Sequence, residues 1–202
     1  MNDSTVGITF RETMRGGFAL GETDPAAGEK RGKEEGTVLT MHASIEIPDV
    51  RAFIADASHG GRISGEIAFP PLGKNIAAKS GVFQLFSPTE NPGMKLMVYE
   101  LLFETGGTRY YLAGRKEVRN DPGLDVWTDT TTLFTRLHKG ADKTAPVAGA
   151  GILTLGLDDL ARLVSTMRST GAGSIEEQAK AVLDFGRFFL GELWDSYGKG
   201  KA

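Results

Sequence analysis

A strict alternation of apolar and polar side chains constrains the fold of this chain more than any other feature of its sequence. Between residues 39 and 47 every second side chain is apolar, which is the period of a strand with one buried face and one wet face. The same period recurs at residues 6–10 and 63–69. We therefore expect three half-buried strands in these segments.

Further apolar stretches bring the expected total to about eight strands. They are residues 81–86, 94–104, 109–118, 126–137 and 147–155. Turn-forming residues separate them, and the Gly106-Gly107 pair is typical of a tight hairpin. Because short connections favour antiparallel neighbours, we expect a mainly β fold, an antiparallel barrel or sandwich, and the pattern does not distinguish the two.

Helical spacing replaces the strand period near the C-terminus. Residues 157–167 predict one helix, and the capping pattern at residues 174–177 opens a second that continues to about Tyr197. The apolar residues of the second helix cover more than one face. This predicts that the helix packs on two sides, and that one of these sides contacts a barrel mouth or a partner protein. We expect both C-terminal α-helices to pack on the sheet.

One long connection stands apart by its charge. Residues 21–36 hold eight charged side chains and no large apolar one, so we expect a mobile, solvated loop between the first two strands. The 202 residues are expected to form a single domain, with a sheet body at 5–155 and a helical segment at 156–197.

The composition excludes several classes of function. A net charge of −3 gives no attraction toward nucleic acid, and the absence of cysteine excludes disulfides and thiolate-based metal sites. No apolar run reaches the roughly 20 residues of a membrane span. We therefore expect a soluble, cytoplasmic protein without a nucleic-acid partner.

No sequence motif of a common catalytic or cofactor site is present. The nearest dinucleotide-like pattern, Gly149-Ala150-Gly151, lacks a third glycine at Thr154 and opens a strand rather than a helix. A calcium site is conceivable near the turn, because three carboxylates lie close together in sequence at Asp121, Asp125 and Asp129. Their spacing is not that of a helix-loop-helix calcium site, and it favours a role of the aspartates in the turn itself. We expect no cofactor, no metal and no catalytic residue.

The candidate ligand-binding residues are His42, Arg115, Trp127, Asp129 and Thr131. The threonine-rich stretch 127–133 predicts a strand. Its hydroxyl groups and its indole would also suit the lining of a pocket for an amphipathic ligand. An exposed position on a strand is the simpler interpretation of His42, and a cross-strand ion pair with an aspartate is the simpler one for Arg115.

Four stretches of the sequence resemble a known accessory domain. They are residues 10–16 (Phe-Arg-Glu-Thr-Met-Arg-Gly), 81–86 (Gly-Val-Phe-Gln-Leu-Phe), 127–133 (Trp-Thr-Asp-Thr-Thr-Thr-Leu) and 188–197. Together they resemble a domain attached to large cholesterol-oxidase-like glucose–methanol–choline oxidoreductases, from about residue 5 to residue 197. The resemblance implies a link to lipid or sterol metabolism, and it transfers no oxidase activity because the flavin belongs to a separate region.

Three hypotheses about function follow. The leading one is a non-catalytic β module that binds a hydrophobic small molecule, lipid or sterol-like, or docks onto an oxidoreductase or other protein partner. The second is a stand-alone enzyme whose acid and base meet only in the fold, with His42, Asp129 or Glu12 in those roles. The third is a structural or oligomerisation subunit.

Overall fold

The computed structural model describes residues 5–119 and 126–197, which form ten strands and five helices. The strands are β1 (Val6–Leu20), β2 (Val38–Ile47), β3 (Gly60–Phe69), β4 (Gly73–Ala78), β5 (Ser80–Pro88), β6 (Met94–Thr105), β7 (Thr108–Arg119), β8 (Thr132–His138), β9 (Val147–Thr154) and β10 (Arg168–Gly171). The helices are α1 (Pro25–Glu35), α2 (Val50–Ala55), α3 (Val126–Thr131), α4 (Leu157–Thr166) and α5 (Ile175–Tyr197).

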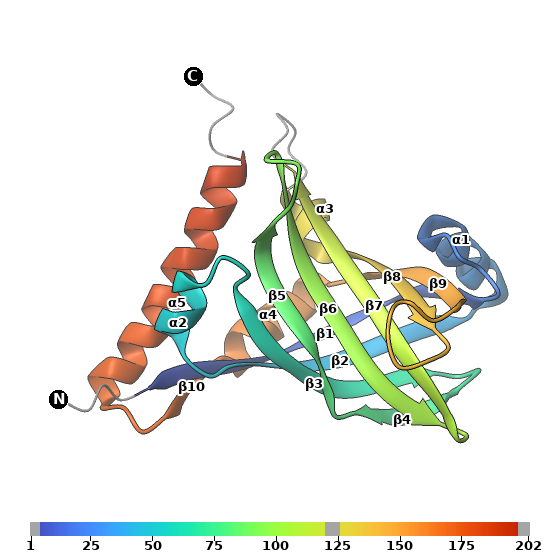
Figure 1. The fold of residues 1–202 in the computed structure, drawn as a ribbon, viewed down its shortest axis with the longest axis horizontal. Coiled ribbons are helices and arrows are strands. Elements are labelled where there is room, and N and C mark those ends of the chain that lie inside the picture. Colours follow the sequence, from blue (N-terminus) through green and yellow to red (C-terminus); the bar gives the residue numbers. More distant parts are fainter. Residues whose placement is uncertain (1–4, 120–125, 198–202) are drawn as a thin grey trace.

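The sheet closes on itself as an antiparallel barrel. Eight of the ten strands follow the order β1-β2-β3-β5-β6-β7-β8-β9, and β9 pairs with β1 to close the ring. The remaining two strands are additions at the margin, since β4 pairs with β3 and β10 pairs with β1 (Figure 1). The expected antiparallel β fold is thus confirmed, and of the two architectures left open the structure is the barrel.

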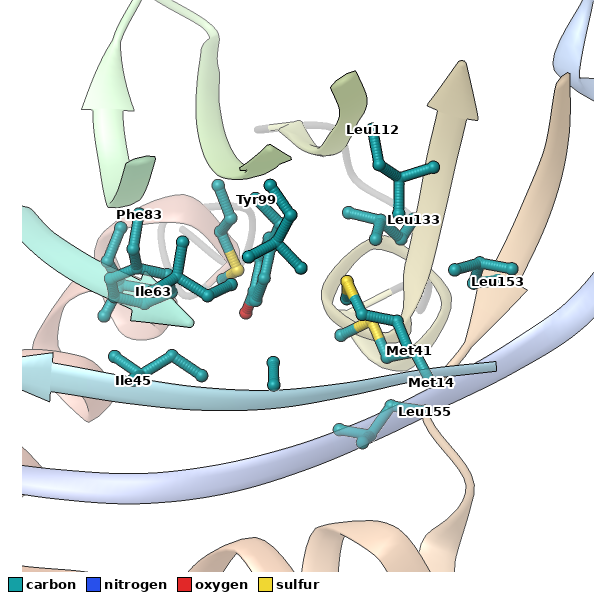
Figure 2. Packing of buried hydrophobic residues seen from close by; sticks show 14 of the residues in the cluster. Met14, Met41, Ile45, Ile63, Phe83, Tyr99, Leu112, Leu133, Leu153 and Leu155 are labelled. Carbon is teal, nitrogen blue, oxygen red and sulfur yellow. The ribbon is translucent and has the colours of Figure 1, made fainter. Parts of the chain in front are cut away.

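Alternate side chains of the eight barrel strands point into the barrel interior. On β2, for example, Leu39, Met41, Ala43, Ile45 and Ile47 are each at most 2% exposed, as the alternation predicts. Figure 2 shows aliphatic, thioether and aromatic side chains from opposite walls meeting inside the ring. The interior is therefore occupied by the protein's own side chains.

The predicted hairpin at Gly106-Gly107 is confirmed. It joins β6 to β7, and both glycines have positive φ, 55° and 71°. Two successive residues with positive φ define the type I′ turn, whose twist matches that of the strands it joins.

The prediction of a loop at residues 21–36 is wrong, because this segment contains helix α1. Asp24 caps the helix by accepting a hydrogen bond from the Ala27 amide (2.9 Å), and Pro25 occupies the first turn. Without large apolar side chains, α1 still packs on the barrel through glycine. A Cβ on Gly28 would lie 2.0 Å from the Ala150 carbonyl oxygen, and one on Gly32 would lie 2.2 Å from the Phe18 nitrogen. Direct contact between helix and strand backbones replaces side-chain packing here.

The expected strand at residues 126–137 is only half right. Its first half is helix α3, and strand β8 begins at Thr132. Strands β4 and β10 and the short helix α2 were not foreseen, since each is too short to show a clear period. Both predicted C-terminal helices are present, as α4 and α5. None of the helices in the described ranges combines the length and the apolar character needed to cross a membrane.

Helix α5 packs against one end of the barrel, on the side opposite α1 (Figure 1). Phe185 contacts Phe10 of β1, with ring centroids 5.9 Å apart, and Phe189 contacts Phe86 of β5 at 5.4 Å. Lys95 of β6 forms an ion pair with Glu192, which ties the C-terminal half of α5 to the strands. The helix thus closes this end of the barrel with aromatic side chains.

Candidate functional site

Three polar side chains meet inside the barrel, whose interior is mostly apolar. Tyr99 of β6 donates a hydrogen bond to Glu12 Oε1 of β1 (3.3 Å), and Lys116 Nζ of β7 donates one to the Tyr99 hydroxyl oxygen (3.3 Å). The same Nζ lies 4.8 Å from the centroid of the Tyr99 ring, a cation–π distance. We call Glu12, Tyr99 and Lys116 the interior polar cluster.

The interior polar cluster is almost completely shielded from water. Glu12, Tyr99 and Lys116 are 7%, 2% and 2% exposed. Burial raises the pKa of the Tyr99 phenol well above its ordinary value, and the adjacent Glu12 carboxylate raises it further. Burial also lowers the pKa of the Lys116 amine, an effect that Glu12 opposes. The environment therefore favours a neutral phenol and increases the fraction of neutral amine.

One atom of the interior polar cluster has no hydrogen-bond partner among residues 5–119 and 126–197. Glu12 Oε2 is buried and receives no hydrogen bond from these residues, while Oε1 accepts from Tyr99. The residues paired with Glu12 along the next two strands are small, Ala43 on β2 and Gly65 on β3. A buried carboxylate oxygen without a donor is costly, because desolvation is not offset by a hydrogen bond. An incoming donor at this oxygen would remove that cost.

The interior polar cluster lies one layer beneath the barrel end that α5 closes. Glu12 follows Phe10 by two positions on β1, and Phe10 contacts Phe185 of α5. Lys116 pairs with Met97 on β6, two positions after Lys95, which binds α5. Two residues along a strand correspond to about 7 Å. The aromatic side chains of α5 thus stand between the polar cluster and solvent at this end.

Backbone strain gathers where α5 meets the barrel. His59 and Phe86 both have positive φ, 43° and 52°, a conformation that costs such residues about 1 kcal/mol or more each. Both contact Phe188 of α5, at ring distances of 4.6 Å for His59 and 6.2 Å for Phe86. Strained residues concentrate at functional contacts more often than in ordinary cores.

Two of the predicted ligand-binding residues lie on the outside of the barrel. His42 is exposed on β2, where its Nδ1 shares a 3.0 Å hydrogen bond with Thr13 Oγ1. The side chain of Arg115 is 52% exposed on β7 and forms an ion pair with Glu117 at 3.1 Å rather than with an aspartate. Their strand positions point away from the interior polar cluster.

The other three predicted residues belong to helix α3. Asp129 Oδ2 accepts a hydrogen bond from the Arg119 amide at 3.3 Å, and Thr131 is buried, its carbonyl accepting from the Leu155 amide at 3.0 Å. Trp127 lies in the first turn of α3, and its side chain is outside the described residues. Asp121 and Asp125, the other aspartates of the calcium hypothesis, also lie outside them. Among the described side chains, His42 hydrogen-bonds to Thr13 of β1 and not to a residue of α3.

Three hollows on the surface of the described residues are notable, and none of them includes a predicted ligand-binding residue. One of 220 Å³ lies between α2, α5 and the start of β1, and contains the Lys180–Asp184 ion pair. One of 820 Å³ lies between β4 and β6, and one of 180 Å³ lies where β3 divides its pairing between β4 and β5. All three are open to solvent and separate from the interior polar cluster.

Sequence reasoning identified one member of the cluster and missed two. Glu12 was named as an acid or base of the enzyme hypothesis, whereas Tyr99 and Lys116 were not singled out for the site they form. The available signal was the position of each residue in the alternation of its strand. Glu12 stands between Phe10 and Met14, and Lys116 stands between Gly114 and Val118. At these positions the alternation requires side chains that point into the barrel.

Comparisons with known proteins identify no relative. No protein-family model matches the chain, no curated protein matches it, and no solved structure matches its fold. The function therefore has to be argued from the geometry of the chain itself.

Proposed function

We propose that this protein binds an amphipathic small molecule inside its barrel, with an apolar chain or ring system and an uncharged, oxygen-bearing head. The head lies at the interior polar cluster, and the apolar part extends toward the end closed by α5. Lipid alcohols and sterols have this chemistry. The resemblance to a domain attached to cholesterol-oxidase-like enzymes agrees with such a ligand class.

The observation that carries the proposal is the unpartnered Glu12 Oε2. Replacement of buried ionic groups by apolar residues is often neutral or stabilising, so such a group is poorly explained by stability alone. A ligand hydroxyl donating to Glu12 Oε2 would complete the hydrogen bonding of the carboxylate. Within the described part of the chain Lys116 donates only to Tyr99, so it has donors left for the oxygen of the same head.

Access to the interior polar cluster requires helix α5 to move. Its aromatic side chains occupy the barrel end above the cluster, and the closed interior is filled with side chains. The ion pair that ties α5 down is partly exposed, with Lys95 and Glu192 side chains 31% and 19% accessible. Such a pair contributes at most about 1 kcal/mol, so the aromatic contacts of Phe185 and Phe189, rather than the ion pair, supply most of the attachment that has to open.

Native mass spectrometry tests the proposal. Delipidated protein is mixed with 1-dodecanol, with cholesterol and with dodecane, and a 1:1 complex is expected with an alcohol. Glu12→Gln should weaken dodecanol binding about tenfold, the effect of losing roughly 1.5 kcal/mol from a hydrogen bond to a charged group. Binding of dodecane should be unchanged in the same variant. The absence of any complex with either alcohol would refute the proposal.

A matched control separates binding inside the barrel from adsorption to the surface. Leu190 and Trp194 of α5 face solvent at 66% and 72% exposure. The variant Leu190→Ser/Trp194→Ser should bind dodecanol as the unchanged protein does. If this variant loses binding while Glu12→Gln retains it, the ligand sits on α5 and the interior is not the site.

The other expectations from the sequence stay predictions. The partner enzyme, the stand-alone enzyme and the oligomerisation subunit have no observation here that favours them over the barrel ligand. The enzyme hypothesis and the present proposal both assign a role to Glu12. His42, the other group of the enzyme hypothesis on these strands, lies outside the barrel and has no role in the present proposal.

A further inference from the structure

We propose that Lys116 captures the carbonyl group of an aldehyde or ketone ligand as an imine, making the barrel a covalent, reversible carrier of apolar carbonyl compounds. This inference rests on the proposed function, since the carbonyl compound must first bind inside the barrel. It adds a chemical role for Lys116 and a ligand class, apolar aldehydes and ketones.

The position of the amine suits this chemistry. Lys116 is 2% exposed, and among the described residues its Nζ hydrogen-bonds only to the Tyr99 hydroxyl. The neutral amine is the nucleophile, and burial lowers the pKa of Lys116, which increases the neutral fraction. An exposed lysine such as Lys74 has no such environment.

The neighbours of Lys116 provide the proton transfers that the reaction needs. The Lys116 nitrogen forms a bond to the carbonyl carbon, and one of its protons passes to the carbonyl oxygen to give a carbinolamine. Loss of that hydroxyl with a second nitrogen proton releases water and leaves the C=N bond. Tyr99 lies between amine and carboxylate, 3.3 Å from Nζ and 3.3 Å from Glu12 Oε1. It is placed to relay a proton from the Lys116 nitrogen to the Glu12 carboxylate, since its oxygen accepts from Nζ and its hydroxyl donates to Oε1.

The reaction needs no oxidant or reductant. One carbonyl compound and one amine give one imine and one water, and hydrolysis by the reverse path releases the ligand unchanged. The apolar side chains around the bound ligand exclude water and slow hydrolysis of the imine, and displacement of α5 allows release.

The experiment is reductive trapping followed by peptide mapping. Unmodified protein is incubated briefly with dodecanal and sodium cyanoborohydride, and alkylation is measured at every lysine. Lys116 should be modified at least about tenfold faster than Lys74, because binding raises the local concentration of the carbonyl. With glycolaldehyde, which has no apolar chain, Lys74 should react first. Modification of surface lysines with an unmodified Lys116 would overturn the inference.

The two proposals fail separately in this design. Binding of dodecanol without trapping at Lys116 retains the proposed function and refutes the imine, whereas absence of dodecanol binding refutes the proposed function. Lys116→Arg should show no trapping at position 116, because a guanidinium forms no imine with an aldehyde under these conditions. Tyr99→Phe should slow trapping more than it weakens dodecanol binding. The mapping of the unmodified protein decides the question even if a variant fails to fold.

Discussion

Substitution of Gly28 by alanine tests the unusual packing of α1 on the barrel. In an exposed helix this change normally stabilises by about 1 kcal/mol, because alanine is the better helix former. Here the new Cβ would lie 2.0 Å from the Ala150 carbonyl oxygen. Ordinary contacts between non-bonded carbon atoms are about 3.5 Å or longer, so α1 has to shift outward by roughly 1.5 Å.

The expected cost follows from that shift. The clash is with backbone, which has no alternative rotamer, so the overpacking penalty should lie near the upper end of the usual range, about 3 kcal/mol. After the gain in helix propensity, Gly28→Ala should destabilise by about 2 kcal/mol. For a chain of this size that corresponds to a melting temperature lower by roughly 4–8 °C.

Gly186 provides the matched control within the same protein. It lies in α5, and a Cβ there would meet nothing within 4 Å. Gly186→Ala should therefore raise the melting temperature by about 2–4 °C in differential scanning calorimetry. If Gly28→Ala stabilises the protein as much as Gly186→Ala does, α1 does not rest on the strand backbones and the packing argument is wrong.

Three further predictions concern the cap of α1, the cluster and the α5 ion pair. Asp24→Ala should cost about 1 kcal/mol in urea unfolding, because it removes the side-chain acceptor for the Ala27 amide; no loss would contradict the capping role. The pKa of Tyr99 in the folded protein is raised above the ordinary 10.0. The contribution of Tyr99 to the free energy of unfolding is therefore complete below pH 10 and is lost as the pH rises above 10. Relative to Tyr99→Phe, the unchanged protein should lose up to about 1.4 kcal/mol per pH unit above pH 10, and parallel stability curves would refute the burial of Tyr99. Lys95→Glu should speed uptake of a fluorescent lipid alcohol up to about fivefold, and Lys95→Glu/Glu192→Lys should restore the original rate; equal rates in all three proteins would exclude the ion pair from gating.

Much of the barrel was predictable because its strands have one face toward solvent and one toward the core, which produces an alternation of polar and apolar residues. The alternation on β2 marked both the strand and its buried side chains, and Gly106-Gly107 marked the β6–β7 turn. Closure was not predictable, since it depends on the pairing of β9 with β1, which are far apart in sequence and carry no local signal of their register.

The errors have identifiable physical causes. The sequence predicts a loop for the α1 segment because the segment lacks large apolar residues, although Asp24, Pro25 and Gly36 are ordinary start and stop signals of a helix. Its glycines allow backbone contact, so no apolar stripe is needed. In residues 126–131 the β-branched side chains favoured a strand, and the local preference was overridden by the position of α3 against β7.

The candidate site was less accessible to sequence reasoning than the fold. Glu12, Tyr99 and Lys116 come from three strands separated by up to 104 positions, as their numbers show. Each is unremarkable alone, and only strand register places them within hydrogen-bonding distance. A charged residue at an inward position of an alternating strand was the one available signal.

Fluorine NMR of Tyr99 tests most directly whether a ligand reaches the interior polar cluster. The chain has four tyrosines, so protein labelled with 3-fluorotyrosine gives a simple spectrum in which Tyr99→Phe identifies one resonance. Addition of dodecanol should shift the Tyr99 resonance selectively and saturably. A Tyr99 resonance that stays fixed while dodecanol binds would contradict the account, because the ligand would then lie elsewhere.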